Sequence, residues 1–104
     1  MYLARFSYNV RPVDRQRAID MIRREVEAGR AKGFEARLLV PLTRAPDGAA
    51  LQFEIELKTL DQLESFRRHG GGGGKPTADW MHEFSEILLC PPAVEILRVE
   101  SAAG

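Results

Sequence analysis

The chain has 104 residues, 44% hydrophobic and 29% charged, which predicts one globular domain spanning residues 1–104. Fifteen basic and fifteen acidic side chains give zero formal net charge, which argues against binding to nucleic acid or to an anionic membrane. The single cysteine, Cys90, excludes an internal disulfide and argues against a zinc cluster. With no signal peptide and no apolar run near the ~20 residues of a membrane span, we expect a cytoplasmic protein.

The first predicted strand covers residues 2–10, where aromatic and β-branched side chains alternate with others. Pro12 suits the first position of a following helix. Gly33 is expected to end that helix in the left-handed region that glycine favours. Arg15 lies on the apolar stripe of this helix, where its aliphatic stem fits against a core while its charge reaches water. The stripe consists of Ala18, Ile19, Ile22, Val26 and Gly29.

Two further strands are predicted at residues 35–43 and 51–57, and the second has the clearest alternation of the chain. Between them, Pro46 presets φ and Gly48 accepts a positive φ, a combination typical of a turn. The last strand is predicted at residues 94–100, followed by a frayed tail.

The second helical segment is predicted in two pieces, interrupted by the five glycines at 70–74. Thr59 and Gln62 form a capping-box pattern that begins the first piece. Thr77 is a good N-cap for the second piece, and Pro91 ends it. In that second piece an apolar face is expected (Trp80, Met81, Phe84, Ile87, Leu88), with a solvent face opposite (His82, Glu86, Leu89).

The order of elements predicts an α+β protein with the ferredoxin-like βαββαβ fold, in which four antiparallel strands carry both helices on one face. The helix-covered face is expected to carry Phe6, Tyr8, Phe53 and Ile55. The other face is expected to carry Leu3, Arg5, Ser7, Leu39, Gln52, Glu54 and Leu97. Because the first and third strands are neighbours in this topology, Arg5 is expected to pair with Glu54 or Glu56. A second copy of the chain is the expected cover of this bare face, since two-fold homodimers are the commonest assemblies.

The order of elements is combined with the motif Trp80-x-x-x-Phe84, which precedes a final strand that reads Glu95-Ile96-Leu97-Arg98-Val99. This combination resembles the dimeric α/β-barrel superfamily. In that superfamily two ferredoxin-like protomers pack sheet to sheet. Its small members include antibiotic-biosynthesis monooxygenases and polyketide cyclases. The resemblance therefore implies an enzyme that acts on a small hydrophobic molecule, aromatic or polyketide-like, without a metal or an organic cofactor.

The resemblance also implies a ligand pocket between sheet and helices, beside residues 69–77. His69 is the candidate base, because an imidazole titrates near neutral pH. Tyr8 and Asn9 are catalytic candidates at the end of the first strand. The substrate-binding candidates are Arg15, Phe53, Phe66, Trp80 and Phe84. Each candidate also has an ordinary explanation: a surface histidine, strand-end packing for Tyr8, helix capping for Asn9, and core positions for the aromatic residues.

Two alternatives remain open at this stage. The first is a non-catalytic binding or accessory protein on the same fold, since fold does not determine function. The second is a heme-degrading monooxygenase, for which Asn9, Phe66 or Trp80, and His82 are the comparable residues. The glycine run is not a phosphate-binding P-loop, because that motif requires glycine at position 69 and Ser or Thr at position 76.

Overall fold

The computed structural model describes residues 1–43, 51–69 and 82–100, without the side chains at positions 63 and 66–69. The elements in chain order are β1 (Tyr2–Tyr8), the 3₁₀ helix η1 (Pro12–Asp14), α1 (Arg15–Ala31), β2 (Glu35–Leu39), β3 (Leu51–Leu57), α2 (Leu60–His69) and β4 (Ala93–Arg98). Residues 82–85 form a further short helical turn. The predicted turn at 44–48, the glycine run, the helix start at Thr77 and the tail lie outside the described residues.

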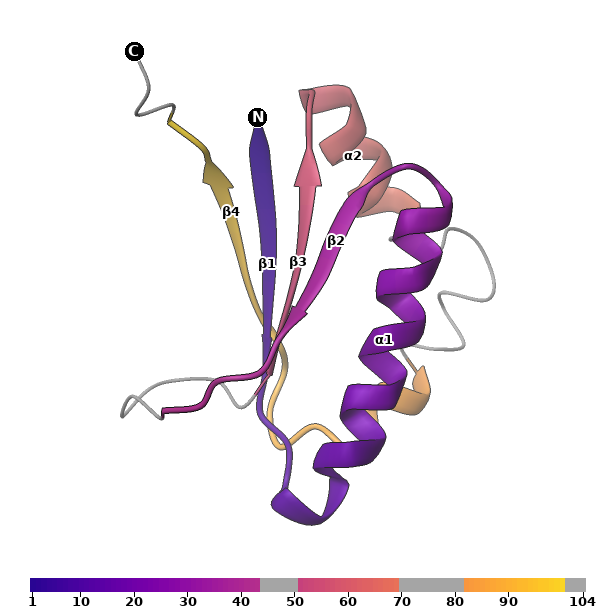
Figure 1. Cartoon of the computed structure of the whole chain (residues 1–104), viewed down its shortest axis with the longest axis vertical. Coiled ribbons are helices and arrows are strands. Elements are labelled where there is room, and N and C mark those ends of the chain that lie inside the picture. The colour runs from indigo at the N-terminus through magenta and orange to yellow at the C-terminus, as the bar shows by residue number, and fades with distance from the viewer. Residues whose placement is uncertain (44–50, 70–81, 101–104) are drawn as a thin grey trace.

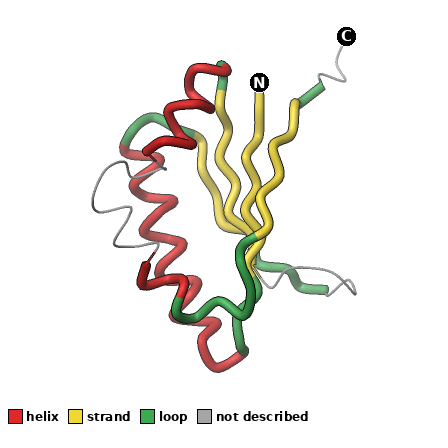
Figure 2. The backbone as a smooth tube through the Cα atoms, turned by 180° about the vertical axis from the view of Figure 1, so that it is seen from behind, coloured by secondary structure: helices red, strands yellow, loops and turns green. Residues whose placement is uncertain are grey.

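The four strands form one antiparallel sheet in the order β2-β3-β1-β4. Both α1 and α2 lie on one face of this sheet, and no helix of the described residues covers the other face, called the bare face below (Figures 1 and 2). The chain therefore has the predicted α+β, ferredoxin-like fold. No helix in the described part of the chain is long and apolar enough to cross a membrane.

The core lies between the sheet and the helices. It is built from the side chains of β1 and β3 that point to the helices, the buried stripe of α1, and two residues near the C-terminus, Phe84 and Ile87. Leu51, Phe53, Ile55 and Leu57 alternate along β3 and are all buried, as their period of two predicts. On α1 the buried set is Ala18, Met21, Ile22, Glu25, Val26 and Gly29.

Two of the predicted helix boundaries with specific capping chemistry are confirmed. At the start of α2, the amide of Gln62 donates to Thr59 Oγ1 at 3.1 Å, and Gln62 Oε1 accepts from the amide of Lys58 at 2.6 Å. At the end of α1, Gly33 has φ +88°. Its amide donates to the Arg30 carbonyl at 2.9 Å and that of Phe34 donates to the Gly29 carbonyl at 3.0 Å, the two bonds of a Schellman motif.

Replacing Gly33 with alanine should lower the free energy of unfolding by about 1 kcal/mol, because an L-residue is strained at positive φ. Gly29 provides a matched control in the same helix. A Cβ built there meets Ala36 Cβ at 3.5 Å and Ile55 Cδ1 at 3.6 Å, which is ordinary contact, and alanine favours helix. Urea unfolding should therefore show Gly29→Ala as neutral or stabilising; equal losses for both variants would contradict the Schellman interpretation.

Four predicted elements end earlier in the structure than expected. β1 ends at Tyr8, and Val10 forms only an isolated bridge with Leu88. β2 ends at Leu39 rather than at position 43, two residues before Pro41, which has no amide to donate. The last helical turn ends at 85 rather than before Pro91, because Leu88 and Leu89 bond to the backbone that follows β1. β4 itself begins one residue earlier and ends two residues earlier than predicted.

Candidate functional site

Three of the predicted site residues meet on the helix side of the sheet. Tyr8 at the end of β1, Phe53 in β3 and Phe84 in the turn at 82–85 are each at most 5% exposed. The rings of Tyr8 and Phe84 meet edge to face with centroids 4.8 Å apart. Phe6 joins the group, 5.7 Å from Phe53 and 6.5 Å from Tyr8. These distances are typical of interacting aromatic pairs, so the four rings form one continuous apolar wall.

Tyr8 brings a hydroxyl group into this wall. Burial raises the pKa of the Tyr8 phenol far above its ordinary value, and the negative charge of Glu25 raises it further. The phenol therefore stays protonated across the physiological range. In this position Tyr8 can donate or accept a hydrogen bond toward a ligand, but it is a poor candidate for a base.

Glu25 is the one carboxylate buried among the described residues of the helix–sheet interface, and sequence analysis missed it. It lies on the core face of α1 and is 8% exposed. The core-facing position of Glu25 could have been predicted from the sequence. Glu25 follows Met21 by four residues and Ile22 by three, which places all three side chains on one face of a helix. A buried carboxylate near a phenol gives this interface an acidic group besides the histidine that the sequence suggested.

An apolar strip adjoins the aromatic wall on the helix side of β4. Val94 pairs with Phe6 and Ile96 pairs with Ala4 across the β1–β4 ladder, so their side chains point to the helix side. Val94 is 54% exposed and Ile96 46% exposed. The reason is that α1 packs on β2 and β3, and α2 packs on β3, at the other half of the sheet. The strip is thus apolar surface that the described helices leave open.

Two polar candidates remain, Asn9 after β1 and Arg15 in α1, and Asn9 is engaged differently from the prediction. Asn9 does not cap the helix that follows, because the N-cap of η1 is Arg11, without a side-chain capping bond. Instead, Asn9 Nδ2 lies 3.7 Å from Cys90 Sγ, and the Asn9 carbonyl accepts from the Leu89 amide at 2.9 Å. Arg15 is half-buried and is the first residue of α1. This helix begins at the end of the sheet where β1 ends (Figure 1).

The remaining candidates can be placed only in part. His82 is exposed, as the helical periodicity predicts, while Phe84 on the same turn is buried. Phe66 and His69 belong to the C-terminal half of α2, but their side chains lie outside the described part of the chain. Trp80 lies outside the described residues as well. The structure therefore brings together Tyr8, Phe53 and Phe84.

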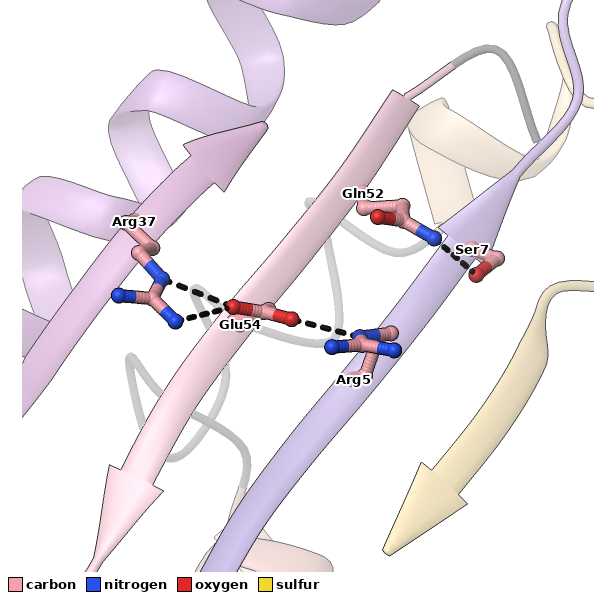
Figure 3. Close-up of polar contacts among 5 residues, drawn as sticks. All are labelled: Arg5, Ser7, Arg37, Gln52 and Glu54. Carbon is pink, nitrogen blue, oxygen red and sulfur yellow. Dashed lines mark hydrogen bonds and ion pairs between the residues drawn. The ribbon is translucent and has the colours of Figure 1, made fainter. Parts of the chain in front are cut away.

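On the bare face, the structure shows a charged cluster centred on Glu54 (Figure 3). Arg5 Nε donates to Glu54 Oε2 at 2.6 Å, as the strand order predicts, and Arg37 donates to Oε1 through Nε at 2.8 Å and Nη2 at 2.7 Å. Glu54 is 1% exposed, although it points to the side without helices. The guanidinium groups of Arg5 and Arg37 contact it from two sides (Figure 3). Next to the cluster, Gln52 Nε2 lies 3.4 Å from Ser7 Oγ.

The two guanidinium groups keep Glu54 ionised. Burial alone would raise the pKa of the Glu54 carboxyl, but the hydrogen bonds from Arg5 and Arg37, together with their charges, hold this pKa below its ordinary value. Charge-assisted hydrogen bonds of this kind are among the stronger polar contacts in proteins. Glu56, the alternative partner in the prediction, forms no ion pair with another described residue.

A small hollow at the β2 end of the bare face has a volume of about 130 Å³. It is lined by Leu3, Arg30, Glu35, Ala36, Arg37, Glu54 and Glu56. Pockets for drug-sized ligands usually measure about 300–1,000 Å³, so this hollow is too small for a fused-ring substrate. Among the described residues, no three His, Cys, Asp or Glu side chains are grouped so as to hold a metal ion.

The fold defines an α+β protein of the ferredoxin-like class, with a wall of aromatic rings on the helix side of the sheet and a charged cluster on the other side. Solved structures share this fold over nearly the whole chain. Rv0793 from Mycobacterium tuberculosis matches with a TM-score of 0.71 and 18% sequence identity, covering 100% of both chains. A crystal structure described as an antibiotic biosynthesis monooxygenase matches with a TM-score of 0.69 and 12% identity, over 97% of this chain and 100% of the other.

A conserved protein from Methanosarcina mazei Go1 also matches, with a TM-score of 0.69 and 14% identity, over 96% of this chain and 94% of that protein. No protein-family model and no curated protein sequence matches the chain. At these identities the likeness establishes the fold, and it agrees with the predicted resemblance to antibiotic-biosynthesis monooxygenase-like proteins.

Proposed function

We propose that the protein is a small-molecule enzyme, a monooxygenase or cyclase, that acts on a hydrophobic aromatic or polyketide-like substrate without a metal or an organic cofactor. The substrate would bind on the helix side of the sheet, against the wall formed by Phe6, Tyr8, Phe53 and Phe84. The solved structure described as an antibiotic biosynthesis monooxygenase, which has the same fold, supports this proposal by analogy.

The observation that carries the proposal is the open apolar strip beside a buried hydroxyl. Val94 and Ile96 are about half exposed on the helix side of β4, and apolar surface left open next to buried aromatic rings is typical of a binding site. Tyr8 adds a neutral phenol at the inner end of the strip. A flat, hydrophobic molecule with one polar group fits such a surface, because its ring system covers the strip and its polar group reaches Tyr8.

The proposed chemistry needs a base. Removal of a proton from a phenol gives an electron-rich anion for reaction with oxygen, and removal of a proton next to a carbonyl gives the enolate for cyclisation. We assign the base to His69, with Glu25 as the second candidate. Tyr8 and Asn9 would hold the substrate oxygen by hydrogen bonds. Arg15, Phe66 and Trp80 would complete the binding surface together with Phe53 and Phe84.

We also propose that the active form is a homodimer joined through the bare face of the sheet. Leu3, Leu39 and Leu97 lie on this face by strand alternation and by their register. Met1 and Val99 extend this apolar set at one end of the bare face and are 51% and 41% exposed. A face that combines such residues with ion pairs resembles the mixed composition of protein interfaces.

Replacing Tyr8 with phenylalanine tests the site while keeping its packing. The ring contacts with Phe84 and Phe6 remain, so the free energy of unfolding should change by less than about 1 kcal/mol. Turnover of fused-ring phenols, followed by oxygen consumption or by cyclised product, should fall about tenfold or more if the hydroxyl orients the substrate. His69→Ala should lower turnover further, and the exposed His82→Ala serves as its matched control.

Glu25→Gln separates the two candidate bases. If Glu25→Gln abolishes turnover and His69→Ala does not, the base is the carboxylate rather than the imidazole. If Tyr8→Phe, Glu25→Gln and His69→Ala all leave turnover unchanged, the catalytic site lies elsewhere. If the wild-type protein binds these phenols, as seen in the emission of its single tryptophan, but converts none of them, a non-catalytic binding protein is the better interpretation.

A further inference from the structure

The four strands separate their charged side chains by face, with one exception. Arg98 of β4 lies directly opposite Tyr2 of β1, which in turn lies opposite the buried core residue Leu57 of β3. Because residues opposite each other in a sheet share a face, Arg98 points to the helix side. Among the described strand residues it is the only charged one on that side. The others lie on the bare face: Arg5, Glu35, Arg37, Glu54, Glu56 and Glu95.

Arg98 continues the apolar strip of β4. Val94, Ile96 and Arg98 alternate along the strand, so their side chains follow one another on the helix side. With a rise of about 3.3 Å per residue, Arg98 lies about 13 Å from Val94 along the strand. Tyr8 lies at the other end of the strip, beyond the pair formed by Phe6 and Val94. This side of the sheet therefore presents, in order, a neutral phenol, an apolar strip and a cation.

The guanidinium group of Arg98 can be taken over by a ligand. Arg98 Nη2 lies 2.6 Å from Glu100 Oε1, but the two side chains are 73% and 75% exposed. An ion pair this exposed contributes little to stability, because water competes for both groups. A ligand that covers the apolar strip and also carries a carboxylate can replace Glu100, since it adds apolar contact to the same charge. The edge strand β4 is accessible to such a ligand, because α1 lies at the opposite edge of the sheet (Figure 1).

The chemistry of an arginine beside an apolar strip favours a carboxylate as the ligand group. The planar guanidinium group matches a carboxylate through two parallel hydrogen bonds, and both are charge-assisted. A single arginine balances the single charge of a carboxylate. The strip itself requires a hydrophobic body, because Val94 and Ile96 offer no polar group. A molecule with an apolar ring system and one acidic end is thus complementary to this part of the sheet.

We infer that the substrate is a hydrophobic carboxylic acid, whose ring system covers Val94 and Ile96 and whose carboxylate binds Arg98, at the end of the strip opposite Tyr8. This inference rests on the proposed function and adds the chemical class of the substrate and the residue that selects it. Glu100 then competes with the substrate for the same guanidinium group. Arg98 fixes the direction in which the substrate lies, because only one of its ends is acidic.

A matched pair of ligands tests the selection of an acid. Pyrenebutyric acid and pyrenebutyramide have the same fused-ring body and differ in the charge of the end group. The fluorescence anisotropy of the pyrene ring gives the dissociation constant of each. The wild-type protein should bind the acid about tenfold more tightly than the amide, because only the acid forms charge-assisted hydrogen bonds. Added salt should reduce this preference, since it screens exposed charges.

Two neighbouring substitutions should change the affinity for the acid in opposite directions. Arg98→Gln should reduce the affinity for the acid to that for the amide, whereas Glu100→Gln should increase it by removing the competing carboxylate. Neither should change the affinity for the amide, so a general disturbance of the fold would not produce this pattern. Arg24→Gln, at an exposed position of α1, is the matched control and should change neither affinity. Ile96→Asn should weaken both ligands alike, because both cover the strip.

The results that would overturn the inference differ from those that would overturn the proposed function. If both ligands bind with equal affinity, or if Arg98→Gln keeps the preference for the acid, Arg98 does not select the substrate, while the apolar binding surface of the proposed function remains. If neither ligand binds to the wild-type protein, or if Ile96→Asn binds both as the wild type does, the strip is not the binding site. The proposed function would then lose the observation that carries it, and this inference would fall with it.

Discussion

Replacing Phe84 with alanine is expected to lower the free energy of unfolding by about 3–5 kcal/mol, the usual cost of truncating a buried phenylalanine. Phe84 is 2% exposed and is among the largest fully buried side chains of the chain. It attaches the turn at 82–85 to the sheet through its contact with Tyr8, where the ring centroids are 4.8 Å apart. Domains of this size have roughly 5–15 kcal/mol of stability, so the variant would lose a large fraction of it.

Thermal and urea unfolding should both detect this loss, with a melting temperature lower by roughly 15 °C or more. Leu89 provides the control, because it lies five residues further along the chain, is 62% exposed, and should be replaceable by alanine within about 0.5 kcal/mol. Phe84→Leu should fall between the two. A loss below 1 kcal/mol for Phe84→Ala would mean that the segment after residue 81 does not pack on Tyr8, and the proposed binding wall would lose one of its members.

The sequence predicted those elements whose signals are local. β3 has the predicted bounds because its four buried apolar side chains, Leu51, Phe53, Ile55 and Leu57, alternate with the others and so allow only one register. The C-terminal end of α1 follows from Gly33, and the start of α2 follows from Thr59 with Gln62. Their capping bonds join residues at most five positions apart. Features of this kind depend on residues close together in the sequence, so they can be predicted without knowledge of the rest of the fold.

The predicted boundaries failed where distant contacts decide them. Helical periodicity continues through Ile87 and Leu88, yet the helical turn ends at 85 because Leu88 bridges to Val10 and the Leu89 amide bonds to the Asn9 carbonyl. These bonds join segments about eighty residues apart, and a local pattern contains no information about them. Propensity is commonly overridden by tertiary contacts of this kind.

The two buried glutamates, Glu54 and Glu25, show the same contrast between features that the sequence could predict and features that it could not. The pairing of Arg5 with Glu54 was predicted, because the topology fixes β1 and β3 as neighbours. The contribution of Arg37 was missed, because the register of β2 against β3 depends on a connection that the sequence leaves undefined. Glu25 was missed for a different reason: a charged residue next to an apolar stripe is usually solvated, and only the packing of α1 on the sheet buries it.

The second large effect is expected from removing both arginines that hold Glu54. In the double variant Arg5→Met with Arg37→Met, unbranched apolar side chains replace the two arginines, and the carboxylate loses its hydrogen bonds and compensating charges. Leaving a buried carboxylate without its partners costs about 3–5 kcal/mol. Removal of the carboxylate instead is expected to cost less, because the side chains of Arg5 and Arg37 are 31% and 55% exposed and can turn to water.

Adding Glu54→Leu to the double variant should recover most of the lost stability, since a well-packed apolar cluster often replaces a buried ion pair without cost. The triple variant is therefore the control that separates an uncompensated charge from disturbed packing. Urea unfolding of the wild-type protein, the double variant and the triple variant should be measured at one protomer concentration, because the apparent stability of a homodimer depends on concentration. A triple variant no more stable than the double variant would show that the loss comes from packing rather than from charge.

The pH dependence of stability gives an independent check, because its sign should reverse. In the wild-type protein the arginines hold the pKa of Glu54 below its ordinary value, so its contribution is complete above the pKa of the unfolded chain and is lost as the pH falls through the folded pKa. In the double methionine variant only burial acts on Glu54, which raises the folded pKa above the unfolded one. Protonation then favours the folded state, and acidification toward the unfolded pKa should stabilise this variant relative to neutral pH. The double variant could instead lose stability with acid, as the wild type does. Another positive charge or water would then stabilise the Glu54 carboxylate, and the two arginines would not be the groups that keep it ionised on the bare face.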